Sequence, residues 1–236
     1  MADTDTDPLR EAADVMRTVR DRCVWTQQIG HRDLVPYLVE ESAELIDAVE
    51  TGSRAELREE LGDLLWQVLF HAEIASRDPD DPFDIDDVAR SLTEKMVRRH
   101  PHVFGDAVAN TPEEVLVHWN AAKALEKHER RSVLDGVSER MPSLALAQKL
   151  LGRAAGADIR TSSTLRHGPD GPAHGPRVET RHTPPATEAE LGDALLALVE
   201  SARENGWDAE RALRERVRRL QDEVRAAEAS GSDLEN

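Results

Sequence analysis

The chain has 236 residues, enough for one well-packed domain or for one domain and a smaller remnant. Its 47 acidic and 30 basic residues give a net charge of −17, which argues against binding to nucleic acid polymers, because such binding needs a basic surface. A single cysteine excludes an intramolecular disulfide and fits a cytoplasmic location, and no apolar run approaches the length of a membrane span.

The first predicted helix covers residues 9–22, where Val15, Met16 and Val19 recur at helical spacing. It is followed by two helices within residues 37–71. The turn Thr51-Gly52-Ser53 is short enough to fold these two helices back antiparallel, and Ser53 followed by Glu56 predicts a capping box at the start of the second one.

Each of these two helices carries a pair of acids three residues apart. The pairs are Glu41 with Glu44 and Glu60 with Asp63, and residues at this spacing project from the same face of a helix. The acids lie beside apolar stripes rather than opposite them. The stripes are Leu38, Leu45, Ile46 and Val49 on the first helix, and Leu61, Leu64, Leu65, Val68, Leu69 and Ala72 on the second.

Four carboxylates on facing helices repel one another strongly unless a cation lies between them. Such hard oxygen ligands favour Mg²⁺, Mn²⁺ or Ca²⁺ over zinc, and neither helix has the Glu-x-x-His spacing of di-iron bundles. The other interpretation is a solvated acidic face, because short acidic pairs arise by chance in a chain with 33% charged residues.

Two further predicted helices carry basic side chains and a tryptophan. One runs from Asp84, its predicted N-cap, to Arg99, and its last turn is basic, which a helix dipole favours in any case. The next begins at Thr111-Pro112 and carries Trp119 and Lys123 on neighbouring turns. From the residues alone, Trp119 is interpreted as a core side chain.

The composition changes after a short apolar helix at residues 144–155. Residues 161–185 are rich in Gly and Pro and read as a disordered linker. A helix capped by Thr187 then contains Glu190 and Asp193, which repeat the spacing of Glu60 and Asp63. The last predicted helix covers residues 208–229.

A longer pattern joins these elements. Glu40-Glu41-x-x-Glu44 is followed after fifteen residues by Glu60-x-x-Asp63. The flanking runs are Cys23-Val24-Trp25, Pro36-Tyr37-Leu38, Gln67-Val68-Leu69-Phe70-His71-Ala72, the basic run from Lys95 to Asp106, Trp119 with Lys123, and Leu134-Asp135-Gly136. Over residues 10–156 this order resembles the MazG nucleoside triphosphate pyrophosphohydrolases. Val24 and Thr26 depart from it, because the family usually has Pro and Asp there.

The resemblance implies an all-α fold with a MazG-like bundle in residues 1–156, whose four-helix core is completed by a homodimer. Residues 157–186 would be the linker, and residues 187–236 a helical remnant of a second MazG-like copy. Glu190 and Asp193 are expected to be structural there, because half a metal site cannot hold the ion.

The resemblance also implies a reaction, the hydrolysis of nucleoside triphosphates to monophosphate and pyrophosphate. Mg²⁺, or alternatively Mn²⁺, would be held by Glu41, Glu44, Glu60 and Asp63, and an activated water would attack the α-phosphorus. The implied substrate contacts are Lys95, Arg99, Trp119 and Lys123. Spacing does not identify a general base, because Glu40 and Glu41 point in different directions.

Two alternatives stay open from the sequence. One is a catalytically weak nucleotide-binding regulatory module on the same helical bundle, which would bind nucleotide without releasing product. The other is a helical interaction protein whose acidic pairs only decorate its surface.

Overall fold

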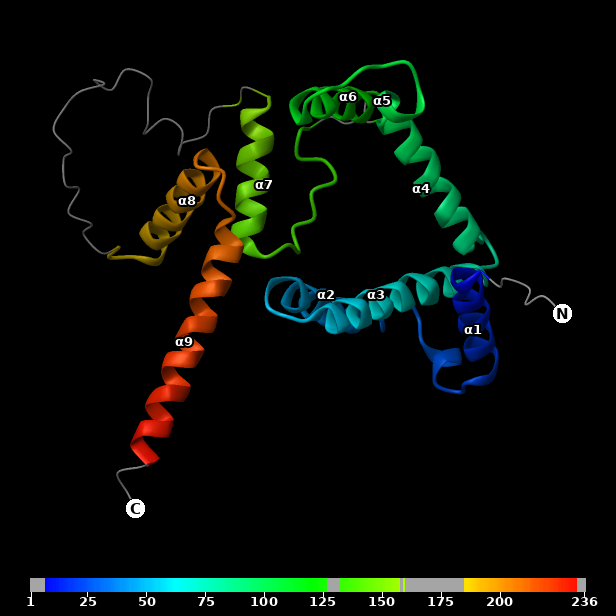
Figure 1. Ribbon diagram of the computed structural model, residues 1–236, viewed down its shortest axis with the longest axis horizontal. Coiled ribbons are helices and arrows are strands. Elements are labelled where there is room, and N and C mark those ends of the chain that lie inside the picture. The colour runs from blue at the N-terminus through cyan, green and yellow to red at the C-terminus, as the bar shows by residue number, and fades with distance from the viewer. Residues whose placement is uncertain (1–6, 127–131, 158, 160–184, 233–236) are drawn as a thin grey trace. The chain divides into compact units, whose positions relative to one another are not determined.

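The computed structural model describes residues 7–126, 132–157, 159 and 185–232, and all regular secondary structure in these residues is helical (Figure 1). This confirms the predicted all-α class. The elements are α1 (Pro8–Arg22), the 3₁₀ turn η1 (Thr26–Gln28), α2 (Val35–Glu50), α3 (Arg54–Ala75), α4 (Ile85–Arg99), α5 (Pro101–Phe104), α6 (Pro112–Leu125), α7 (Ser143–Ala155), α8 (Glu188–Glu204) and α9 (Ala209–Ser232). None of these helices is long and apolar enough to cross a membrane.

Contacts divide the chain into two compact units, residues 1–127 and 128–236. The second unit holds α7, α8 and α9, which pack on one another. The domain limits at 156 and 186 follow composition and resemblance, so they stay predictions. The predicted linker, residues 161–185, falls almost entirely outside the described residues.

The main core of the first unit lies between α1, the start of α2 and the C-terminal half of α3. Its buried side chains are Ala13, Met16, Leu34, Leu69 and Phe70. Asp7 caps α1 by accepting a hydrogen bond from the backbone N–H of Leu9, and its carboxylate suits the positive end of the helix dipole. This core anchors α3 and therefore fixes the helix that carries two of the predicted metal ligands.

Thr26 has a structural role at the position where the sequence departs from the family. It is buried in η1, and its hydroxyl oxygen lies 3.0 Å from the carbonyl oxygens of both Val19 and Cys23. Both carbonyls also accept a backbone N–H, from Cys23 and Gln27 respectively, so the single hydroxyl proton adds a further hydrogen bond where α1 ends and η1 begins.

A tight turn joins α2 to α3 (Figure 1), and the two helices pack against each other. Ser53 and Glu56 form the predicted capping box, in which each side chain accepts from the backbone N–H of the other residue. Gly52 is required by a close approach: a Cβ at this position would lie 2.7 Å from the Cα of Ala48. The turn therefore fixes how α2 and α3 face each other.

The chain continues from α3 into α4, on which α5 and α6 pack. Asp84 begins α4 with a second capping box, shared with Asp87, and Thr111 begins α6 by accepting from the N–H of Glu114. Both helix starts agree with the predicted N-caps. The basic last turn of α4 thereby comes to lie beside α6.

The second unit is held partly by polar contacts between helices. Gln148 of α7 donates to the carbonyl of Trp207 and accepts from the N–H of Ala209, at 2.8 and 3.2 Å. Thr187 caps α8 as predicted, and the carboxylate of Glu190 accepts from the N–H of Ala186. Glu190 therefore has a capping function at the start of α8.

Candidate metal centre

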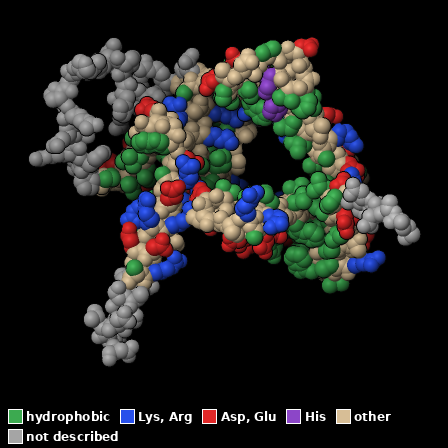
Figure 2. Space-filling model, viewed as in Figure 1, with side chains coloured by type: hydrophobic (Ala, Val, Ile, Leu, Met, Phe, Trp, Pro, Cys, Tyr) green, Lys and Arg blue, Asp and Glu red, His purple; other side chains and the backbone are tan. Residues whose placement is uncertain are grey.

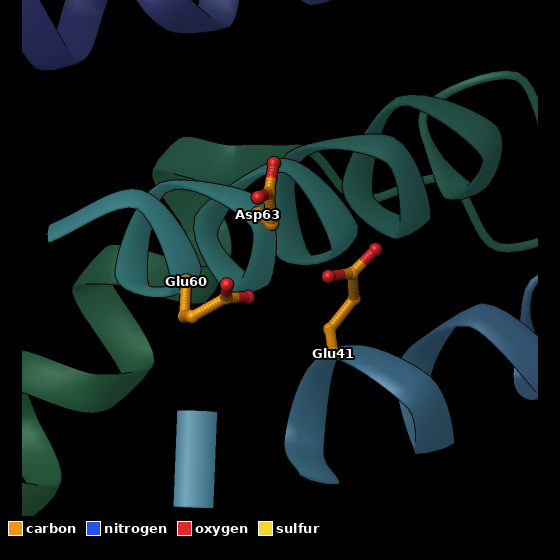
Figure 3. A group of neighbouring side chains, drawn as sticks. All are labelled: Glu41, Glu60 and Asp63. Carbon is orange, nitrogen blue, oxygen red and sulfur yellow. The ribbon is translucent and has the colours of Figure 1, made fainter. Parts of the chain in front are cut away.

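Three of the four predicted metal ligands come together between α2 and α3. Glu41 reaches from α2 toward Glu60 and Asp63, which stand one turn apart on α3 (Figure 3). One carboxylate oxygen from each residue lies within 4.8 Å of the others. Glu41 and Glu60 are half-buried, whereas Asp63 is exposed.

The cluster is electrostatically strained without a cation. Acidic side chains gather over α2 and α3 (Figure 2). Partial burial raises the pKa of Glu41, and the negative charges of Asp63, Glu44 and Glu60 raise it further. The pKa of Glu60 is raised for the same reasons, by burial first and then by Glu44 and Asp63.

The donor set fits a divalent metal ion. Among the described residues, no group donates a hydrogen bond to the buried Oε2 atom of Glu60. A buried carboxylate oxygen without a donor is unfavourable, and an ion bound by oxygen would remove that deficit. The three residues together offer six oxygens of the hard type that Mg²⁺ and Mn²⁺ prefer.

Glu44, the fourth predicted ligand, stands outside this group of three. It is exposed on α2, and its charge acts on both Glu41 and Glu60. Glu44 lies next to the cluster, and its role as a metal ligand stays a prediction.

The predicted substrate contacts lie on another pair of helices, α4 and α6. The guanidinium carbon of Arg99 lies 4.9 Å from the ring centre of Trp119, and the ring of His100 meets the same indole edge to face at 5.2 Å. Trp119 is half-buried, with Arg99 over its ring and His100 in edge-to-face contact with it. Lys95 and Lys123 are half-buried as well, one turn from Arg99 and Trp119 respectively.

Sequence reasoning missed Glu126, which lies at the C-terminal end of α6. Its carboxylate accepts hydrogen bonds from Arg98 and Arg99 at the end of α4. No local spacing signals this contact, because 27 residues separate Arg99 from Glu126.

Comparison with known proteins decides the family. Residues 29–104 match the family model of the MazG nucleotide pyrophosphohydrolase domain. A nucleoside triphosphate pyrophosphohydrolase of Escherichia coli is 35% identical over 240 residues, which cover 94% of this chain and 90% of that protein. The chain belongs to the MazG family.

Other relatives show how far the similarity extends. An uncharacterized 26.1 kDa protein of Streptomyces cacaoi is 46% identical over 93% of this chain and 82% of its own length. A nucleoside triphosphate pyrophosphohydrolase of Mycobacterium tuberculosis is 47% identical over 64% of this chain and 46% of its own length. The residues matched by the MazG domain contain the four acids, Lys95 and Arg99, whereas Trp119 and Lys123 lie beyond them.

Proposed function

We propose that this MazG-family protein hydrolyses nucleoside triphosphates to nucleoside monophosphates and pyrophosphate. The observation that carries the proposal is the convergence of Glu41, Glu60 and Asp63 from two helices on one point. Family membership supports the reaction type, since two relatives are named nucleoside triphosphate pyrophosphohydrolases. A purely decorative acidic face would not require a buried carboxylate oxygen such as that of Glu60.

Mg²⁺, or alternatively Mn²⁺, is the proposed cofactor, with Glu41, Glu60 and Asp63 as ligands and Glu44 beside them. A divalent cation bound there would polarise a phosphoryl oxygen and lower the pKa of a water molecule next to it. The protein's own contribution is to hold the carboxylates on two rigid helices, so that the ion and the triphosphate meet in a fixed orientation.

Lys95, Arg99, Trp119 and Lys123 are the proposed substrate contacts. The three cations would offset negative charge on the phosphates as it moves toward the leaving pyrophosphate. Trp119 offers an aromatic surface for the base, but its contacts with Arg99 and His100 leave only part of that surface accessible.

A homodimer is the proposed state of assembly, and a cytoplasmic location is proposed from the single cysteine. Large apolar side chains stay exposed on α2 and α3 within one chain. They include Val39, Val49, Leu61 and Val68, at 65%, 64%, 53% and 46% of their surface. A second copy packed on this face would remove these side chains from water and complete a four-helix core.

The rival function is a nucleotide-binding regulatory module that has lost turnover. Thr26 favours it, because the side chain at this divergent position is buried and bound to backbone carbonyls. Product formation separates the two functions, whereas nucleotide binding does not.

The deciding experiment measures turnover of a panel of canonical and modified triphosphates, with and without Mg²⁺, and separates the products. Metal-dependent release of monophosphate and pyrophosphate is expected. Release of diphosphate and phosphate would refute the proposed bond cleavage, and Mg²⁺-dependent binding without products would favour the regulatory module.

Substitution of two cluster residues tests the site itself. Glu41→Gln and Asp63→Asn keep the size of each side chain but remove its charge, so we expect each to lower kcat by about a hundredfold or more. Glu113→Gln, an exposed acid on α6, is the control and should leave turnover unchanged. Full activity of either cluster variant would refute the assignment.

A further inference from the structure

A single carboxylate binds two consecutive arginines where α4 meets α6. The Nη2 atom of Arg99 lies 2.5 Å from Oε2 of Glu126, and its Nε atom lies 3.2 and 3.3 Å from the two carboxylate oxygens. The Nε atom of Arg98 donates to Oε1 of the same carboxylate at 3.0 Å. Glu126 thus fixes both guanidinium groups at once.

Arg99 is more buried than Arg98. The side chains of Arg99 and Glu126 are only 12% and 18% exposed, whereas that of Arg98 is 53% exposed. The guanidinium carbon of Arg99 also lies over the indole ring of Trp119, 4.9 Å from its centre. Hydrogen bonds from Arg99 and Arg98 lower the pKa of Glu126 to about 2, so its carboxylate is charged at every physiological pH.

The ion pair between Arg98 and Glu126 borders an open cavity. This cavity has a volume of about 520 Å³, within the usual range for small-molecule sites. Arg98 and Glu126 form part of its wall, together with Pro101, His118 and Leu125. A pair that only joined two helices would not need a ligand-sized space beside it.

Donor groups remain after Glu126 is satisfied. A guanidinium has five N–H groups, and Glu126 accepts from the Nε and Nη2 groups of Arg99. The Nη1 group of Arg99 has no hydrogen-bond acceptor within the part of the chain that the structure describes. Two guanidinium charges against one carboxylate also leave a net positive charge at this place.

We propose that Glu126 is a positioning residue, which orients Arg98 and Arg99 so that their remaining N–H groups bind phosphate oxygens of a nucleoside triphosphate. This inference rests on the proposed function and adds Arg98 to the substrate contacts. A carboxylate that accepts from both Nε and Nη2 fixes the plane of a guanidinium, and an aromatic ring beside it limits its movement, which favours bidentate binding of phosphate. The orientation is thereby set before the substrate arrives, so that less entropy is lost on binding.

The test compares Glu126→Ala, Glu126→Gln and Glu126→Asp with the unmodified protein in steady-state hydrolysis of a triphosphate with Mg²⁺. Glu126→Ala should raise KM about tenfold with a smaller change in kcat, because the two guanidinium groups lose their fixed plane. Glu126→Gln should lie between Glu126→Ala and the unmodified protein, and Glu126→Asp should recover part of the affinity. Glu113→Ala, an exposed acid on the same helix, is the matched control and should leave KM unchanged.

A double variant shows whether Glu126 acts through the arginines. The Arg99→Ala variant lacks the guanidinium that Glu126 mainly orients. Adding Glu126→Ala to this variant should therefore raise KM by much less than Glu126→Ala raises it in the unmodified protein. Thermal unfolding of each variant records any loss of stability separately. A lower Tm with an unchanged KM would mean that the ion pair only joins α4 to α6, and would overturn the inference.

The direction of the KM change in Glu126→Gln tests the inference a second time. A lower KM in Glu126→Gln would mean that the carboxylate competes with phosphate for the arginines, which also overturns the inference. If Arg98→Ala and Arg99→Ala both keep the original KM while monophosphate and pyrophosphate are still formed, this inference fails and the proposed function stands. If the unmodified protein forms neither product from any triphosphate, the proposed function itself fails.

Discussion

At the acidic cluster, the carboxylates that would bind a cation also repel one another in its absence. At Glu60, one carboxylate oxygen is also buried without a hydrogen-bond donor in the described residues. The raised pKa of Glu60 means that the folded, metal-free chain binds its proton more tightly than the unfolded chain does. Stability therefore falls as pH rises above the usual value of 4.5, and at neutral pH the ionised cluster opposes folding.

Glu60→Gln should accordingly raise the Tm of the metal-free protein at pH 7.5 and have a smaller effect near pH 4.5. The same variant should lose most of the Tm increase that Mg²⁺ gives the unmodified protein, since one ligand is missing. Differential scanning calorimetry with EDTA or Mg²⁺ measures both effects, and Glu94→Gln on the exposed side of α4 is the control. An equal Mg²⁺ shift in Glu60→Gln and the unmodified protein would speak against this site.

A histidine pair gives a pH dependence of the opposite sign. The Nδ1 atoms of His31 and His71 lie 2.8 Å apart, so one nitrogen donates to the other and both rings cannot be charged without loss of that bond. Burial and the neighbouring His31 lower the pKa of His71 from its usual 6.5. The folded state therefore resists protonation, and stability decreases as pH falls below 6.5.

His71→Gln should reduce the loss of folding stability at acidic pH. Urea denaturation at several pH values between 5 and 8 would measure it, and the free energy of unfolding of the variant should change less between pH 7 and pH 5 than that of the unmodified protein. Parallel curves for the two proteins would show that the pair has no part in the pH dependence.

On the scale of helices, a close backbone approach constrains the turn between α2 and α3. Gly52→Ala would place a Cβ 2.7 Å from the Cα of Ala48, and we expect a loss of about 1–3 kcal/mol in the free energy of unfolding, as for overpacked cores. Gly192→Ala in α8 is the matched control, because a Cβ there meets no atom within 4 Å. That control should gain about 0.5–1 kcal/mol from the better helix propensity of alanine. Chemical denaturation measures both values, and equal effects would contradict the close-approach argument.

The sequence was sufficient to predict structural features that depend on residues close to one another in the chain. Ser53, Asp84 and Thr111 each cap a helix through backbone groups two or three residues away, so their chemistry is visible in the sequence itself. The meeting of Glu41 with Glu60 and Asp63 follows from the short turn in the same way. The contact of Glu126 with Arg98 and Arg99 depends on how α4 and α6 pack, and helical periodicity does not determine that.

For the whole molecule, the apolar stripes of α2 and α3 are only partly covered within one chain. Leu69 and Ala72, predicted on the α3 stripe, are buried in the chain itself, whereas Leu61 and Val68 are exposed. Sequence periodicity identifies a stripe but does not say whether the same chain or a second copy covers it.

Leu61→Lys combined with Val68→Lys tests the proposed dimer. A charge at each position should favour monomers, because lysine ammonium groups do not enter an apolar interface without loss of hydration. Sedimentation analysis at micromolar concentration gives the mass, with Leu198→Lys on α8 as an exposed control that should leave it unchanged. A double variant that keeps the mass of two chains would place the interface elsewhere.

The acidic cluster is also local in sequence, since Glu41 and Asp63 belong to neighbouring helices joined by a tight turn. Contacts between neighbouring elements form early in folding, because little loop entropy is lost when they close. The repulsion among the acids opposes that early step, so divalent cations should speed refolding of the chain as well as stabilise its folded state. A stopped-flow refolding rate that rises with Mg²⁺ concentration in the unmodified protein, and not in Glu60→Gln, would make the proposed cofactor a participant in folding as well as in hydrolysis.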